Sequence, residues 1–127
     1  DLTITKANYL AANQEVGLLR NPAIKSIELK GTPDSPTSSA VVYWNKDKSE
    51  VYLSALHLPA ITAEQQYQLW AIIDGKPVDA GIFDINSNLL KLKDITNASA
   101  FAISLEARGG STTQAGPKGK VYVMGGV

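Results

Sequence analysis

The sequence predicts an all-β fold, an antiparallel β-sandwich of about seven strands with a short N-terminal helical segment. Two patterns predict it. Beyond Pro22, short segments rich in β-branched and aromatic residues alternate with period two, as half-buried strands do. Turn residues separate these segments, and no helical pattern lies between them. The length of 127 residues suits one domain that buries about two thirds of its extended-chain surface.

Residues 1–21 are expected to form a helical lead-in or a linker. Four apolar residues share one helical stripe, Ile4, Ala7, Ala11 and Leu18. The stripe is weak, because two of its positions are alanine and the pattern ends before Pro22. Two interpretations stay open, a short helix packed on the domain or frayed, and the tail of a longer helix that continues toward an upstream segment. Residues 22–127 are then the β-sandwich domain.

Seven segments carry the strand pattern, and they lie at residues 27–29, 39–44, 51–58, 67–73, 78–83, 101–105 and 121–124. The run 69–73 is apolar on both faces, which is typical of a central strand. Asp74-Gly75 separates two strands and predicts a type I′ hairpin turn, which needs positive φ at both central positions. A long polar loop rich in Gly, Ser and Thr is expected at 109–119.

The composition excludes several partner classes and cofactors. Twelve Lys and Arg balance twelve Asp and Glu, so nucleic acid and anionic membrane surfaces find no electrostatic attraction. Cysteine is absent, which excludes disulfides, thiolate nucleophiles and cysteine-bound metals. No cofactor is predicted. No apolar run approaches the roughly 20 residues that cross a bilayer.

No catalytic or metal site is predicted either. His57 is the only histidine, and no Gly-x-Ser-x-Gly elbow accompanies it. The alternation of Asn45, Asp47 and Ser49 resembles the start of a calcium loop. Its sixth and twelfth positions, however, hold neither the glycine nor the glutamate that such a loop needs. A surface histidine and a hairpin turn explain these residues better.

Two alternatives remain open on chemical grounds. A small hydrolase would need two of the carboxylates Asp79, Asp84 and Glu106 in one pocket. A secreted or cell-surface module that binds carbohydrate or protein would need Trp44 or Trp70 exposed on a sheet face. The strand spacing of the tryptophans favours burial instead.

Three stretches carry a resemblance to a known family. Tyr67-Gln68-Leu69-Trp70 is followed by the Asp74-Gly75 hairpin and by Asp79-Ala80-Gly81, and later Glu106 is followed by Gly109-Gly110-Ser111. From about residue 40 to residue 124 the chain resembles the C-terminal domain of the anti-sigma-K factor family. The family often has Pro after the Glu and Pro-Thr after Gly-Gly-Ser. Here stand Ala107 and Thr112-Thr113, so this loop departs from the family pattern.

The resemblance implies a layout and a role. Members have a cytoplasmic sigma-binding region, one membrane span and then this extracytoplasmic domain. The only methionine is Met124 and the chain begins at Asp1, so we expect a part of a longer protein with a membrane anchor upstream. The expected function is non-enzymatic: a sensory or regulatory domain on the periplasmic or extracellular side of a bacterial cytoplasmic membrane. It would control sigma-factor release, and hence transcription, indirectly.

The expected partners follow from this layout. The sigma factor binds a cytoplasmic region that this chain lacks, and an unknown extracytoplasmic protein, protease or ligand contacts the chain itself. An extended polar loop on a rigid sheet is where binding residues commonly lie. The candidate contact residues are therefore Glu106, Arg108, Gly109, Gly110 and Ser111. A plain solvated loop is the alternative interpretation of this segment.

Overall fold

The computed structural model describes residues 22–85 and 89–127, which form eight antiparallel strands and no helix. The strands are β1 (Ile24–Gly31), β2 (Ser39–Asn45), β3 (Glu50–His57), β4 (Gln65–Ile73), β5 (Lys76–Phe83), β6 (Leu90–Lys91), β7 (Ala100–Ala107) and β8 (Val121–Gly126). The predicted all-β antiparallel fold is confirmed. The helical lead-in expected at 1–21 lies outside the described residues.

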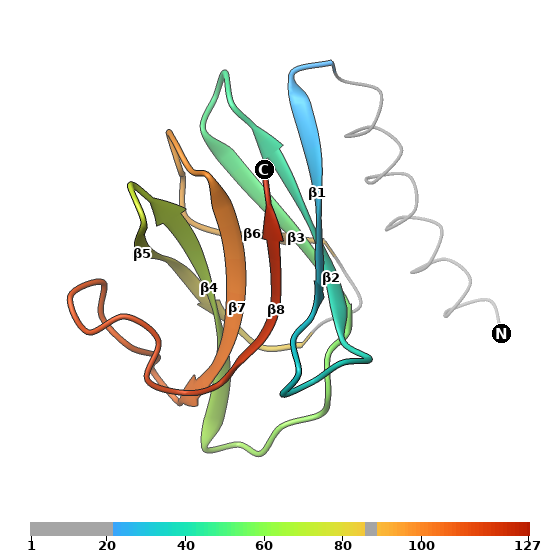
Figure 1. The fold of residues 1–127 in the computed structure, drawn as a ribbon, viewed down its shortest axis with the longest axis vertical. Coiled ribbons are helices and arrows are strands. Elements are labelled where there is room, and N and C mark those ends of the chain that lie inside the picture. Colours follow the sequence, from blue (N-terminus) through green and yellow to red (C-terminus); the bar gives the residue numbers. More distant parts are fainter. Residues whose placement is uncertain (1–21, 86–88) are drawn as a thin grey trace, which may run out of the picture.

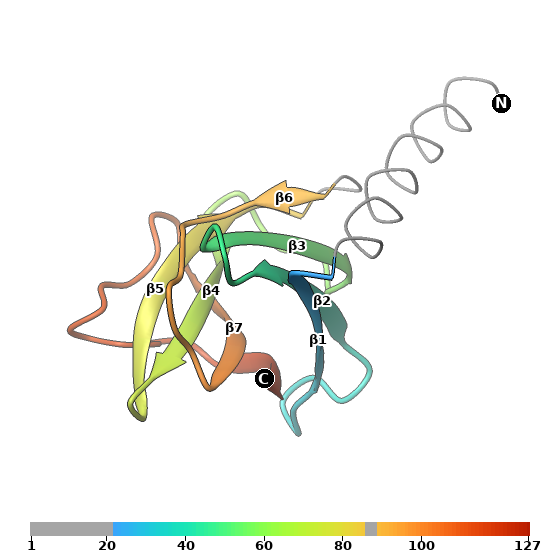
Figure 2. The same cartoon turned by 90° about the horizontal axis from the view of Figure 1, so that it is seen from above.

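All eight strands belong to one sheet, in the order β5-β4-β7-β8-β1-β2-β3-β6. The sheet curls, so that its two halves face each other as the two layers of the predicted sandwich (Figures 1 and 2). The segment after β6 joins the two edges. Leu92 N donates to Val51 O at 2.9 Å, and Lys93 N donates to Ala80 O of β5 at 3.0 Å.

The inner face of the curled sheet is apolar. Trp44 and Phe101, both fully buried, meet edge to face with 5.5 Å between their ring centroids. Tyr67 stacks on Phe83 at 5.9 Å. The indole Nε1 of Trp44 donates to the carbonyl oxygen of Ile95 at 2.8 Å, which satisfies its polar atom. Burial of each large side chain of this kind stabilises the fold by about 1.5–3 kcal/mol.

The turns follow the predicted chemistry. Asp74 and Gly75 have φ values of 53° and 78°, as a type I′ turn requires. Asn45 Oδ1 accepts hydrogen bonds from Asp47 N and Lys48 N at 3.1 and 3.2 Å, which forms the second hairpin turn. Each predicted strand is present. The sequence did not predict β6, because two residues are too short to show a period.

The alternation of β4 and β7 places a second set of residues on the outer face of the sheet. Leu69 belongs to the inner core, so Gln68 and Trp70 point outward. The register pairs Gln68 with Ser104, and Gln66 with Glu106. This outer face is polar, yet its side chains are buried, and the segment that covers it is the loop that follows β7.

Candidate functional site

Residues 108–120, here called the 108–120 loop, connect β7 to β8 and lie against the outer face of β4, β5 and β7. In Figure 1 this is the orange-red loop that extends past β5. Side chains of the sheet bind its backbone at several points. The loop contains four of the five predicted contact residues, and the fifth lies on β7 just before it.

Gln68 binds the first part of the loop. Its side chain is buried, and its Oε1 accepts from Ser111 N at 2.7 Å while its Nε2 donates to Ser111 O at 2.9 Å. Nε2 also donates to Asp79 Oδ1 at 2.8 Å. Gly110, which precedes Ser111, has a φ of 75°, and a Cβ there would clash with Ile82 and with the Gln68 amide. Close approach of the backbone therefore requires glycine at this position.

Glu106 binds the last part of the loop. Its carboxylate is buried and accepts from Lys118 N at 3.2 Å, from Gly119 N at 3.1 and 3.2 Å, and from Ser104 Oγ at 2.5 Å. A Cβ on Gly119 would clash with the carbonyl oxygen of Leu105. Two backbone amides and the Ser104 hydroxyl thus satisfy both oxygens of this buried carboxyl group.

Trp70 lies on the outer face of β4, the side of the sheet on which the loop is attached. It is fully buried although it is outside the hydrophobic core cluster. Its Nε1 donates to Ser104 Oγ at 2.9 Å, and Ser104 Oγ donates onward to Glu106. Its partner in the register is Asp79, whose backbone N–H donates to Thr113 Oγ1 of the loop at 3.0 Å. The buried indole is therefore joined to the polar chain on the side of the sheet where the loop lies.

Asp79 connects the loop face to the segment after β6. Besides Gln68, its carboxylate accepts from Gly81 N at 2.9 Å and forms an ion pair with Lys93. Burial raises the pKa of Asp79, but the hydrogen bonds from Lys93, Gln68 and Gly81, and the charge of Lys93, outweigh it. The net pKa is therefore lower than usual. The carboxylate lies at a β-bulge, where Ala80 is the extra residue.

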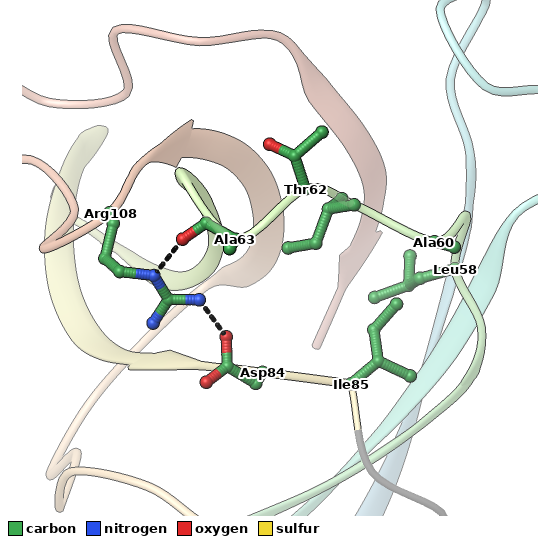
Figure 3. A pocket seen from close by; sticks show the side chains of 8 residues that line it. Leu58, Ala60, Thr62, Ala63, Asp84, Ile85 and Arg108 are labelled. Atoms are coloured by element: carbon green, nitrogen blue, oxygen red, sulfur yellow. Dashed lines mark hydrogen bonds and ion pairs between the residues drawn. The ribbon is translucent and has the colours of Figure 1, made fainter.

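Arg108 lies at the edge of a pocket of about 400 Å³ at one end of the sheet (Figure 3). Its Nε donates to Ala63 O at 2.5 Å, and its Nη2 binds Asp84 Oδ1 at 3.0 Å. Figure 3 shows this ion pair on one side of the pocket and apolar side chains on the other. The large apolar residues of its lining are Leu58, Ile61 and Ile85.

A second groove, of about 690 Å³, lies between the β4–β5 hairpin and the tip of the 108–120 loop. Ile73, Pro77 and Val78 form its hairpin wall, and residues 113–116 form the other wall. The walls touch closely, because a Cβ on Gly116 would lie 3.2 Å from Pro77 Cγ. The loop therefore borders a hollow at each of two places.

The five predicted contact residues differ in exposure. Arg108 and Gly109 are exposed, Gly110 and Ser111 are half-buried, and Glu106 is buried. The structure brings all five to one end of the outer face, where Glu106 holds the loop and the other four belong to it. Their contact with a partner stays a prediction.

Two residues of this site were not predicted as site residues. Gln66 Oε1 accepts from Gly109 N at 3.0 Å, and Gln68 binds Ser111 and Asp79 as described. A signal for them exists in the sequence. Glutamines at alternate positions of a strand that is otherwise apolar on both faces must be buried, and a buried amide needs partners.

The carboxylates and the histidine considered for catalysis or metal binding do not meet at one site. Asp84 pairs with Arg108, while Asp79 and Glu106 have the separate partners given above, so each of the three carboxylates belongs to its own set of contacts. His57 is exposed at the end of β3. Within residues 22–85 and 89–127, no three His, Asp or Glu side chains are arranged to hold a metal ion.

The tryptophans do not form an exposed surface. Trp44 and Trp70 are both fully buried. The hypothesis of a carbohydrate-binding face built on either of them is wrong, because the hydrophobic core encloses Trp44 and the loop side encloses Trp70. The alternative interpretation, that strand spacing means burial, is confirmed.

The comparison with protein families decides the relationship. The family described as anti-sigma-K factor rskA, C-terminal, matches residues 4–121 of the chain. The chain belongs to this family. No curated protein and no solved structure matches it significantly. The resemblance seen in the motifs is thereby confirmed.

In this anti-sigma-K factor domain, the residues that carry the resemblance contact one another. Gln68 comes from the Tyr-Gln-Leu-Trp motif, Asp79 from the segment before Ala-Gly, and Ser111 from Gly-Gly-Ser, and they are joined by hydrogen bonds. Membership indicates an anti-sigma regulatory role. No helix in the described ranges has the length and apolar character of a membrane span.

Proposed function

We propose that this chain is the extracytoplasmic sensory domain of a membrane-anchored anti-sigma factor. In this proposal, residues 1–21 lead from an upstream membrane span into the sandwich domain of residues 22–127. A separate cytoplasmic region holds the sigma factor, and this domain regulates release without touching it. The family match over residues 4–121 is the observation that carries the proposal.

The mechanism we propose is a change of binding free energy, not a chemical reaction. A partner outside the cytoplasm shifts the protein between two states only if it binds one of them more tightly. The charged groups of the site support this. Both oxygens of Glu106 and both of Asp79 already accept hydrogen bonds or ion pairs from the chain itself, so they position the loop.

We propose the exposed part of the 108–120 loop as the contact surface for that partner. Arg108 and Gly109 are accessible, and Gly110 and Ser111 lie next to them on the face that Glu106 and the glutamines hold in place. A preorganised loop binds with a smaller loss of conformational entropy than a free one. The pocket beside Arg108 offers apolar surface for an anchoring side chain.

Membrane topology tests the location. Alkaline phosphatase, which is active only outside the cytoplasm, is fused after Val127 of the whole parent protein, and β-galactosidase is fused at the same place as the reciprocal control. We expect activity from the phosphatase fusion alone. Activity from the galactosidase fusion alone would contradict the proposed side of the membrane.

Sigma-factor control tests the function. We expect the purified 127-residue chain not to bind the sigma factor, while the parent protein does. In cells, Arg108→Ala in the parent should change the response of a sigma-dependent reporter to its stimulus. Lys25→Ala, a matched loss of one exposed positive charge on β1, should leave the response unchanged. Equal responses from both variants, or direct sigma binding by the chain, would contradict the proposal.

A further inference from the structure

We infer that the 108–120 loop opens from the outer face of the sheet as one unit while the core stays folded. The hydrogen bonds of Gln68 hold the loop in its closed position. The inference concerns the domain alone and does not depend on which partner binds it. It rests on how the loop is attached, what lies beneath it, and how it is built inside.

The attachment differs from that of every strand. Backbone ladders hold the strands, but between residues 109 and 119 most of the bonds that join loop to sheet involve side chains. Gln66 binds Gly109 N, Gln68 binds Ser111, and Glu106 binds Gly119 N. Backbone bonds lie near the two bases of the loop, where Arg108 N donates to Glu64 O at 2.9 Å, Gly110 N donates to Ala107 O at 2.9 Å, and Leu105 N donates to Lys120 O at 3.0 Å.

The surface beneath the loop is mostly polar. Its apolar parts are the Trp70 indole and, next to Gly110 and Gly116, the side chains of Ile82 and Pro77. Opening would uncover Gln68, Ser104 and Glu106 together with Trp70, all of which are buried in the closed state. Amide, hydroxyl and carboxylate groups regain hydrogen bonds from water when uncovered, so the net loss per bond is modest. Opening therefore needs less free energy than exposure of the apolar core, and it precedes global unfolding.

The loop is cross-linked within itself, which makes it move as one body. Ser111 Oγ donates to Gly116 O at 2.7 Å, and Gly116 N donates back to Thr112 O at 2.9 Å. Thr112 Oγ1 accepts from Ala115 N at 3.1 Å. These bonds do not involve the sheet, so they survive when the loop leaves it.

Glycines lie at both ends of the loop and have different roles. Gly109 has a φ of 99°, and the space that a Cβ would occupy there is open. Glycine is therefore favoured at this position by the positive φ and not by lack of space. Gly119 is required by space, because a Cβ there would meet the Leu105 carbonyl. The first end can therefore act as a hinge, while the second end is shaped for the closed state.

Amide hydrogen exchange of the intact chain tests the inference. The variant is Gln68→Ala, and the matched control is Gln65→Ala, which removes an amide from the same strand where it binds Thr62 N instead. We expect Gln68→Ala to speed exchange about tenfold or more at Lys118 and Gly119, which Gln68 does not touch. Exchange at Ile103, in the core of β7, should change far less, and Gln65→Ala should leave the loop amides unchanged.

Faster exchange at Ser111 alone, with Lys118 and Gly119 unchanged, would overturn the inference, because the loop would then not open as a unit. Thr113→Val keeps the test decisive if Gln68→Ala fails to fold. Thr113 is exposed, and the change removes only the acceptor of Asp79 N. About threefold faster exchange at Ser111 and Gly119 together is expected. No change at both amides would overturn the inference.

Discussion

The two faces of β4 are stabilised in opposite ways. On the inner face, Tyr67 and Leu69 pack into a continuous apolar core. On the outer face, Gln68 and Trp70 are buried to the same degree, but beneath a loop and among hydrogen bonds. Burial alone therefore does not tell how firmly a residue is covered. How easily a buried residue becomes exposed depends on the type of contact that covers it, because polar contacts can be replaced by water at little net free energy.

Loss of a large core side chain should have the largest effect. Phe101 is fully buried against Trp44, so Phe101→Ala should lower the free energy of unfolding by about 3–5 kcal/mol. Urea denaturation followed by circular dichroism measures the loss. A change below about 1 kcal/mol would mean that the inner face is not the main source of stability.

Gly119→Ala should disrupt the contacts between the loop and the outer face while the packing of the inner face is kept. The new Cβ clashes with the Leu105 carbonyl, and the loop can relieve the clash by leaving the sheet. The cost is then limited to that of opening the loop, about 2 kcal/mol. Unfolding free energy and acrylamide quenching of Trp70 measure the two consequences. A loss as large as that of Phe101→Ala would show that loop and core are not separable.

Alkaline conditions should weaken the inner face. Burial, followed by the charge of Tyr122, raises the pKa of Tyr67 to about 12 from an ordinary value of 10.0, and its hydroxyl donates to Pro59 O at 2.7 Å. A raised folded-state pKa gives stability that is complete below pH 10.0 and is lost as the pH rises through about 12. Tyr67→Phe should lose about 1 kcal/mol at neutral pH and remove this alkaline dependence. An unchanged alkaline profile would contradict the burial of this hydroxyl.

Acid should weaken the outer face, with the smallest effect of the four. The pKa of Asp79 is lower in the folded protein than its ordinary 3.8. Its contribution is therefore present above pH 3.8 and is lost as the pH falls through the folded-state value. Asp79→Asn should reduce the dependence of the unfolding free energy on pH in that range. The control Asp94→Asn, which removes an exposed carboxylate, should not reduce it. Equal flattening by both would contradict the result.

The sequence predicted what depends on local pattern. Period-two alternation located the strands, and Asp74-Gly75 located the tight hairpin with its two positive φ values. Family membership followed from short motifs whose residues turn out to touch. Contacts between distant residues were not predictable in this way. Gln68 meets Ser111 across 43 residues, and nothing local to either residue specifies the other.

Glu106 illustrates the limit at the site itself. The sequence makes Glu106 a candidate contact residue for a partner. The structure places it under the loop with backbone amides of Lys118 and Gly119 as its partners. Only the register with Gln66 and the return of the loop reveal that positioning role, because both depend on tertiary structure.

Access of a quencher to each tryptophan tests the separation of the two faces most directly. Trp44→Phe leaves Trp70 as the only indole, and Trp70→Phe leaves Trp44. Acrylamide quenching is followed against urea, with circular dichroism on each variant as the reference for its own unfolding. We predict that Trp70 becomes accessible to acrylamide at urea concentrations well below the unfolding midpoint of its variant, while Trp44 becomes accessible only at the midpoint. Exposure of both tryptophans at their respective midpoints would contradict a loop that opens over a folded core.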